Sequence, residues 1–98
     1  MAVAQVSSAP SREDYDAVVK HLDLDGNRPA GMILHSAAET PDGEIQILDV
    51  YESREALEAF AQTRLFPAFE AAGLMGRMME RAERTGRPVP YETFDLIV

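Results

Sequence analysis

The sequence predicts a single small α+β domain, because segments with helical and strand-like patterns alternate along its 98 residues. Two polar segments that begin with Ser continue with apolar residues at helical spacing, and a turn motif separates two runs rich in Ile and Val. A chain of this length forms one domain with a modest core. A second copy would bury more apolar surface, so we expect a homodimer.

The first half of the chain predicts a strand, a helix and a β-hairpin. The motif Ser11-Arg12-Glu13-Asp14 has the form of a capping box, and apolar positions from Tyr15 to Leu22 follow at helical spacing. Thr40-Pro41-Asp42-Gly43 is a turn signal between two runs of strand-forming residues. The expected elements are a strand at 2–6 that Ser7–Pro10 ends, a helix that begins at Ser11 and that Asp25-Gly26-Asn27 ends, and strands at Gly31–Ala38 and Glu44–Tyr51.

The second half predicts a long helix, a helical insert and a last strand. The long helix begins near Arg54, and Pro67 should kink or interrupt it. Residues 74–87 form a short helix and a linker, and Tyr91–Val98 form the last strand. The order is β-α-β-β-α-β, which is ferredoxin-like. We therefore expect residues 1–98 to form one domain, a four-stranded antiparallel sheet with helices on one face.

Composition and charge exclude several classes of function. The net charge of −8 disfavours nucleic acids and anionic membranes as partners. No apolar run is long enough to span a bilayer, and the N-terminus does not have the pattern of a secretory signal. The chain has no Cys, and its two His are not spaced as metal ligands, so we expect no metal site and a cytoplasmic protein.

Both faces of the hairpin strands are largely apolar, which is unusual for an antiparallel sheet with one wet face. Helices cover only one face, so a second copy of the sheet is the simplest cover for the other. In the second hairpin strand, one face carries Gln46, Leu48 and Val50, and the other carries Ile45, Ile47, Asp49 and Tyr51.

The length of the hairpin loop decides which side chains meet across the two strands. If Pro41-Asp42-Gly43 is a three-residue loop, His35 faces Asp49 and Ile33 faces Tyr51. A two-residue Asp-Gly loop would break this pairing, because a slip of one residue changes which faces match. With the longer loop, one face combines His35, Asp49 and Tyr51 with Ile33, Ile45 and Ile47.

The stretch from Asp49 to Leu57 (DVYESREAL) resembles the strand-to-helix junction of the dimeric α+β barrel superfamily, in its antibiotic-biosynthesis-monooxygenase-like branch. That junction reads hydrophobic-x-aromatic-Glu-Ser-x-Glu-Ala-hydrophobic. The resemblance covers most of residues 1–98, with 74–87 less well matched. It implies that the strand face carrying Tyr51 lines the pocket of the barrel. The superfamily includes monooxygenases, haem degraders, polyketide cyclases and isomerases, so the resemblance indicates a fold more than a reaction.

Three departures from the branch concern its cofactors and chemistry. Tyr51 occupies the position where oxygenases and haem degraders usually have Trp, and Ile47 the position where some oxygenases have Asn. No His follows His35, whereas haem-degrading relatives place a haem-ligating His in the second helix region. These departures count against haem, and we expect no cofactor.

His35 and Asp49 are the first candidate catalytic pair, because a carboxylate beside an imidazole holds one tautomer and makes a general base. The alternative is a hydrogen-bonded pair in a dimer core. Tyr51 is the third catalytic candidate, as a hydrogen-bond donor to a substrate oxygen, or it fills the core. Arg64 binds a substrate carboxylate or enolate, or extends its charged end to water.

Two functions follow from these candidates. In the first, an enzyme removes a proton from an apolar aromatic or polyketide-like substrate, which then reacts with O₂, cyclises or isomerises. In the second, the barrel is a non-catalytic ligand-binding or stress-associated module. A cavity of about 300 Å³ or more with converging polar groups favours the enzyme. The further expected substrate contacts are Ile33, Ile47, Met75 and Met78, although the methionines have an ordinary helix-packing alternative.

Overall fold

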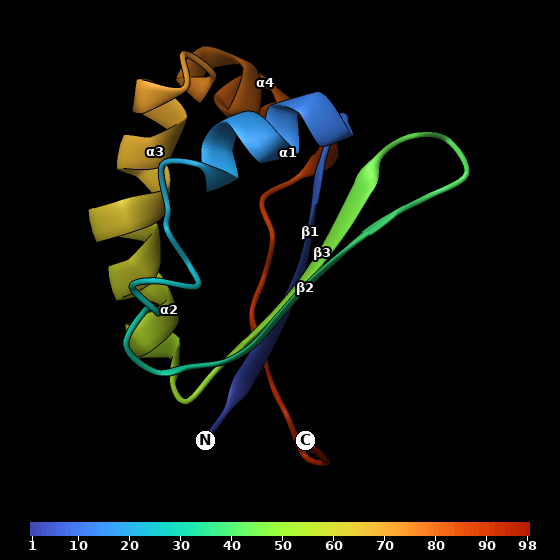
Figure 1. Ribbon diagram of the computed structural model, residues 1–98. Helices are drawn as coiled ribbons and strands as arrows, with labels where there is room; N and C mark the ends of the chain where they lie inside the picture. Colours follow the sequence, from blue (N-terminus) through green and yellow to red (C-terminus); the bar gives the residue numbers. More distant parts are fainter.

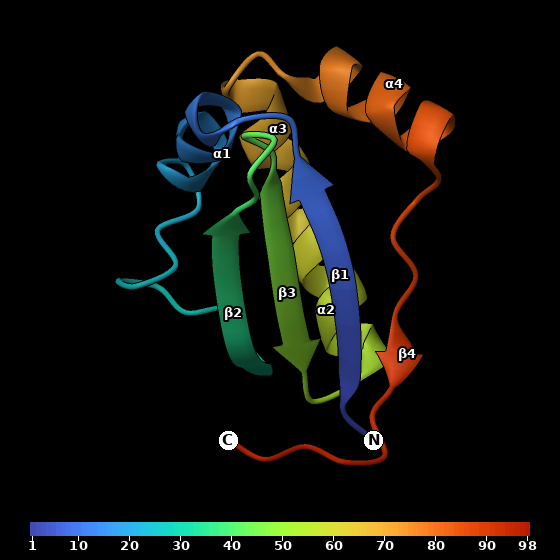
Figure 2. The same cartoon turned by 90° about the vertical axis from the view of Figure 1, so that its right-hand side faces the viewer.

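The computed structural model describes residues 1–98 and has a four-stranded antiparallel sheet in the order β2-β3-β1-β4. This is the predicted ferredoxin-like arrangement. Helices cover one face of the sheet (Figure 1), and Figure 2 looks onto the other face, called here the open face. The elements are β1 (Val3–Ala9), α1 (Arg12–Val19), β2 (Met32–Glu39), β3 (Ile45–Tyr51), α2 (Arg54–Phe60), the π-helical turn η1 (Ala61–Leu65), α3 (Phe66–Ala71), α4 (Met75–Thr85) and β4 (Tyr91–Glu92).

The first and the last strand along the chain, β1 and β4, differ most from the prediction. β1 continues to Ala9 instead of ending at residue 6, because Ser7 and Ser8 pair with β3. Backbone pairing with a central strand thus outweighs the turn preference of Ser. β4 is shorter than predicted, since only Tyr91 and Glu92 pair with β1. The rest of the expected last strand runs past the lower edge of the sheet in Figure 2.

Both predicted helix starts are capped by Ser. The Ser11 hydroxyl accepts the backbone N–H of Asp14 at 3.2 Å, and the Ser53 hydroxyl accepts that of Ala56 at 3.1 Å. The capping box at Ser11 is only half formed, because the Asp14 carboxylate binds Arg77 of α4 instead of returning to the cap.

The predicted interruption at Pro67 is a π-helical turn that precedes it. Pro67 has no N–H to continue the α-helical pattern, and the turn over Ala61–Leu65 widens the helix, with the Phe66 N–H bonded to the Ala61 carbonyl. α2, η1 and α3 therefore remain one continuous helical segment packed along the sheet (Figure 1).

The hairpin has the three-residue loop. The Thr40 N–H donates to the Glu44 carbonyl at 2.8 Å, and Gly43 adopts a positive φ of 86° that favours glycine. The register follows as predicted over most of the hairpin, with His35 opposite Asp49.

A β-bulge near Ile33 ends the predicted register. Met32, not Ile33, lies opposite Tyr51. The expected Ile33–Tyr51 pair is therefore wrong, because the extra residue in β2 shifts the pairing by one position. Arg28 occupies the free edge here, and its guanidinium donates to the carbonyls of Met32 at 3.1 Å and Ile33 at 2.9 Å. Arg28 thus satisfies two backbone acceptors that no neighbouring strand reaches.

The core lies between the sheet and the helices. Tyr51 and Val3 are its most completely buried large side chains, and the rings of Tyr51 and Phe60 pack with centroids 5.7 Å apart. No helix combines the length and the apolar composition that a bilayer crossing requires. The buried cluster consists of Val3, Val18, Leu22, Met32, Tyr51, Leu57, Phe60, Ala68 and Leu74.

Two arginines attach α4 to the rest of the domain. One nitrogen of Arg77 lies 2.9 Å from both carboxylate oxygens of Asp14 in α1. Arg81 donates to Glu44 at 2.6 Å and to Ser8 at 2.9 Å. The predicted insert is therefore held at its helical part by charge-assisted hydrogen bonds.

Replacing Arg77 by Gln should lower the free energy of unfolding by about 1–2 kcal/mol, because the largely buried Asp14 carboxylate loses its partner. Urea denaturation measures the change. Arg84→Gln is the matched control, since Arg84 pairs with Glu80 at 3.6 Å on the exposed surface and should change stability little. Equal effects of the two substitutions would contradict the prediction.

Candidate functional site

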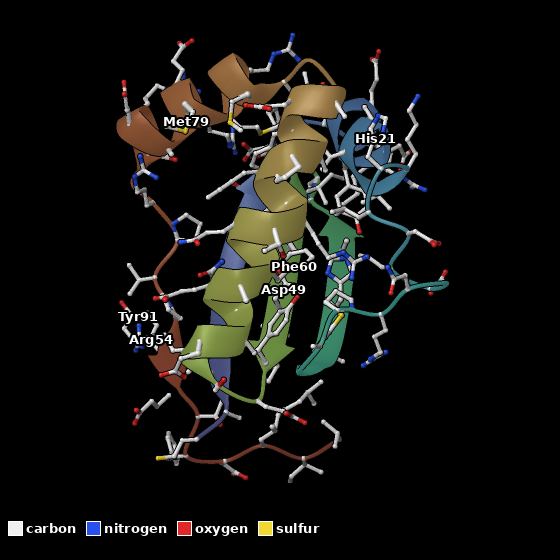
Figure 3. All side chains as sticks on the ribbon, turned by 90° about the vertical axis from the view of Figure 1, so that its left-hand side faces the viewer. His21, Asp49, Arg54, Phe60, Met79 and Tyr91 are labelled. Atoms are coloured by element: carbon white, nitrogen blue, oxygen red, sulfur yellow. The ribbon has the colours of Figure 1, made fainter.

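The pair of His35 and Asp49 lies between the sheet and the helices. Tyr15 of α1 reaches His35, and Phe60 of α2 packs on Tyr51, so the odd-numbered residues of β3 face the helices. The resemblance implied that this face lines a barrel pocket enclosed by strands, but helices of the same chain cover it. Figure 3 looks from the helical side, with the helices in front of the sheet that carries Asp49.

Three side chains from three elements form a continuous hydrogen-bonded chain, called here the Tyr15–His35–Asp49 triad. His35 Nδ1 lies 2.6 Å from the Asp49 carboxylate, and His35 Nε2 lies 2.7 Å from the Tyr15 hydroxyl. The Tyr15 and His35 rings are nearly parallel, at 10°. The hairpin register places His35 opposite Asp49, and the packing of α1 on the sheet adds Tyr15.

The positions of the protons follow from the donors and acceptors. A carboxylate only accepts hydrogen bonds, so the ring hydrogen of neutral His35 is on Nδ1 and Nε2 accepts the Tyr15 O–H. Burial, and then the negative charges of Asp49 and Asp16, raise the pKa of the Tyr15 phenol. Tyr15 therefore stays protonated near neutral pH and acts as the donor.

Tyr15 is the member of the triad that faces a cavity. A cavity of about 270 Å³ is lined by Tyr15 together with residues of α1, β2 and β3, and neither His35 nor Asp49 lines it. Because neither His35 nor Asp49 lines the cavity, Tyr15 is the member of the triad that a molecule in this cavity contacts. The remaining lining residues are Arg12, Ala37, Ala38, Glu39 and Ile45.

Tyr51 makes no hydrogen bond to the pair with which it was predicted to act. Its side chain is completely buried, and its hydroxyl has no hydrogen-bond partner. Burial, followed by the charge of Asp49, raises the pKa of the Tyr51 phenol, so the hydroxyl remains a neutral donor.

Arg64 lies in a different cleft. This cleft has a volume of about 390 Å³, lies between the loop after α1 and the segment η1–α3, and shares no lining residue with the cavity at Tyr15. One nitrogen of Arg64 donates to the Leu22 carbonyl. Arg64 therefore spans the two segments and does not meet His35 or Asp49.

The other predicted substrate contacts line neither space. Ile47 is half-buried on β3, Ile33 lies at the bulge, and Met78 packs against the buried cluster. Met75, at the start of α4, is half-buried and also lines neither cavity. No group of three or more His, Cys, Asp or Glu side chains is placed to hold a metal ion.

Sequence reasoning missed Tyr15 and Arg28. Tyr15 belongs to the apolar stripe of α1 and was interpreted only as a packing residue, although its hydroxyl is the signal that the stripe carries a polar group to the sheet. Arg28 gave no signal, because its role depends on a bulge whose position the sequence did not predict.

Comparison with known families finds no match, and no curated protein matches the sequence. Solved structures do match. Rv0793 from Mycobacterium tuberculosis has a TM-score of 0.64 at 17% identity, with 100% of both chains covered. A candidate antibiotic biosynthesis monooxygenase from Deinococcus radiodurans has a TM-score of 0.57 at 13% identity, covering 100% of this chain and 97% of its own.

A third structure, a candidate antibiotic biosynthesis monooxygenase from Chloroflexus aurantiacus J-10-fl, has a TM-score of 0.55 at 17% identity and covers 74% of this chain and 78% of its own. Identities this low define the fold and not the reaction. The protein thus has the ferredoxin-like α+β fold of antibiotic-biosynthesis-monooxygenase-like proteins, and the resemblance found at the Asp49–Leu57 junction is confirmed at the level of fold.

Replacing Tyr51 by Phe should raise the free energy of unfolding by about 1 kcal/mol, because it removes a buried hydroxyl without a partner and keeps the ring. Urea denaturation tests this, with Tyr91→Phe as the control at a side chain that is 70% exposed. A loss of stability in the Tyr51 variant would mean that the hydroxyl binds a partner such as a buried water.

Proposed function

We propose that this protein is a cofactor-independent enzyme that removes a proton from a small, weakly acidic, largely apolar molecule. The observation that carries the proposal is the Tyr15–His35–Asp49 triad, which ends at a cavity. Two hydrogen bonds of 2.6 and 2.7 Å link a carboxylate to a phenol through one imidazole. Such an arrangement of acid, base and orienting group is typical of proton-transfer sites.

The proton would move in two linked steps. The substrate C–H or O–H gives its proton to the Tyr15 oxygen, while Tyr15 gives its own proton to His35 Nε2. The product is a substrate anion, neutral Tyr15 and an imidazolium, and the Asp49 carboxylate stabilises that imidazolium through Nδ1–H. Tyr15 then donates a hydrogen bond to the anion, which favours its formation.

The anion has two possible fates, both within this proposal. For an anthrone-like methylene, reaction with O₂ converts CH₂ to C=O. The carbon loses four electrons, which reduce O₂. One oxygen atom stays in the product as the carbonyl oxygen, and the other leaves as water. Without O₂, the same anion is reprotonated at another carbon or closes a ring, which is isomerisation or cyclisation. The candidate monooxygenases among the similar structures support the first fate by analogy alone.

A ligand-binding module without chemistry is the second candidate function. The cavity at Tyr15, at about 270 Å³, lies just below the usual range for small-molecule sites, which begins at about 300 Å³. In that case the triad would be a structural link between α1 and the sheet. The two functions differ in whether bound ligand loses a proton.

Anthrone in D₂O without oxygen separates these functions. We expect the protein to accelerate exchange of the methylene hydrogens, measured by NMR, and Tyr15→Phe and His35→Gln to reduce the acceleration by about 10²–10⁴-fold. Tyr91→Phe, an exposed Tyr on β4, should leave the rate unchanged. Oxygen uptake under air then distinguishes oxygenation from isomerisation. Exchange that is insensitive to Tyr15→Phe would contradict the proposal, and binding without exchange would favour the binding module.

We further propose that the open face of the sheet is covered by a second copy of the chain. By strand alternation this face carries Ala4, Val6, Leu34 and Leu48, and Val6 is 58% exposed, whereas Val50 on the same face is already buried. After β4 the chain presents further apolar side chains, with Phe94 98% exposed and Ile97 89% exposed. Apolar surface of this extent on two adjoining regions supports a protein interface.

Sedimentation equilibrium should therefore give twice the chain mass of 10.8 kDa. Val6→Glu should shift the protein toward monomer, because a carboxylate would be buried against the apolar partner face. Met79→Glu is the control, since Met79 is a partly exposed apolar residue of α4, away from the open face (Figure 3). A monomeric mass for the unaltered protein, or an equal effect of both substitutions, would overturn the assembly proposal.

A further inference from the structure

The cleft beside Arg64 has the composition of a site for a small acid. We propose that it binds a small carboxylate with an apolar body, and that Arg64 holds the carboxylate group. The cleft has a volume of about 390 Å³, which lies within the usual range for small-molecule sites. Its lining residues are His21, Leu22, Asp23, Asn27, Thr63, Arg64, Pro67, Ala68 and Ala71.

Arg64 is a cation without an acidic partner in a strongly acidic protein. The chain has 17 Asp and Glu against 9 Lys and Arg, yet no carboxylate lies within ion-pair distance of Arg64. Its one hydrogen bond is to the neutral Leu22 carbonyl. That bond orients the guanidinium and leaves most of its N–H groups free. A guanidinium held in this way is suited to a carboxylate, which it can bind through two parallel hydrogen bonds.

Arg64 lies within the π-helical turn. The turn spans Ala61–Leu65, ends two residues before Pro67 and adds a residue to the helical repeat. Arg64 lies on the same helix face as Phe60, on the stripe that packs toward the core. Its stem therefore lies half-buried beside apolar residues, while its charged end reaches the loop after α1. π-Helical turns of this kind occur frequently at functional sites.

The rest of the cleft suits a ligand that is acidic at one end only. Leu22, Pro67, Ala68 and Ala71 supply apolar surface to the cleft, and Arg64 is the only Lys or Arg among its lining residues. The Asp23 carboxylate lies against Gly26, within 3 Å of where a Cβ at that glycine would be. Asp23 also lines the cleft, so its negative charge would repel a second carboxylate on the ligand, and a monocarboxylate is favoured.

This site is independent of the proposed proton-transfer site. The cleft and the cavity at Tyr15 share no lining residue. They lie at opposite ends of α1, because one includes Arg12 and Tyr15 and the other begins at His21. A ligand in the cleft would therefore leave Tyr15 free.

Benzoate and benzamide form a matched pair of probes, since they share a ring and differ in charge. In ¹H–¹⁵N NMR titrations of the whole protein, benzoate should shift the amide signals of Thr63, Arg64 and Ala71 in a saturable way. Benzamide should bind about tenfold more weakly or worse, because it lacks the charge-assisted hydrogen bonds. Equal shifts with both probes, or benzoate shifts confined to other residues, would overturn the proposal.

Two pairs of variants separate binding from folding. Arg64→Gln should weaken benzoate binding about tenfold or more, whereas Arg87→Gln, the same charge change at an exposed linker residue, should not. Ala71 is exposed on α3 and lines the cleft, so Ala71→Glu should repel benzoate without disturbing the core, and Ala71→Gln should do so much less. Unchanged binding in Ala71→Glu would contradict the site even if Arg64→Gln failed to fold.

The Tyr15→Phe variant distinguishes this inference from the proposed function. It should bind benzoate with unchanged affinity, because Tyr15 lies outside the cleft. Loss of benzoate binding in Tyr15→Phe would place the probe at the triad and remove the second site, whatever the outcome for proton exchange.

Discussion

The pairing of β2 with β3 around a three-residue loop is the constraint on which the rest of the structure depends. Side chains alternate between the two faces of a strand, so a slip of one residue would exchange the buried and open faces of β2. Closure of the loop by the Thr40–Glu44 hydrogen bond places His35 across from Asp49. The same register turns Tyr51 toward the helices, where it packs on Phe60 in the core. Site and core therefore share one strand face.

The β-bulge at Ile33 modifies this register at only one end. Before the bulge Met32 lies across from Tyr51, and after it His35 lies across from Asp49. One strand can thus supply an apolar residue to the core and a polar residue to the site on the same face. The carbonyls of Met32 and Ile33 at the bulge accept hydrogen bonds from Arg28, which lies in the loop before β2. Arg28 thereby supports the strand that carries His35.

The helical layer borders two separate spaces, of which only the cavity at Tyr15 includes residues of the sheet. α1 crosses the sheet and brings Tyr15 to His35, so the imidazole contacts a phenol and not the cavity. At the other end of α1, the π-helical turn before Pro67 brings Arg64 to the Leu22 carbonyl. The two ends of α1 therefore lie beside different groups, the triad of the proposed proton transfer at the first and the guanidinium of Arg64 at the second. Neither space lies on the open face, where we propose the interface with a second copy of the chain.

The sequence by itself determined the order of elements and both Ser caps, and it limited the hairpin to two loop lengths, because these depend on local spacing and on strong turn residues. Only the tertiary structure decided that the hairpin takes the longer loop and pairs His35 with Asp49, that α1 covers this pair and Tyr15 bonds to it, and that neither Tyr51 nor Arg64 does so. Those outcomes depend on how a helix packs across a sheet, on the bulge in β2 and on a π-helical turn. The bulge and the π-helical turn each add one residue to a regular repeat, and the packing of α1 on the sheet joins segments far apart in the chain, so local spacing alone does not give the resulting contacts.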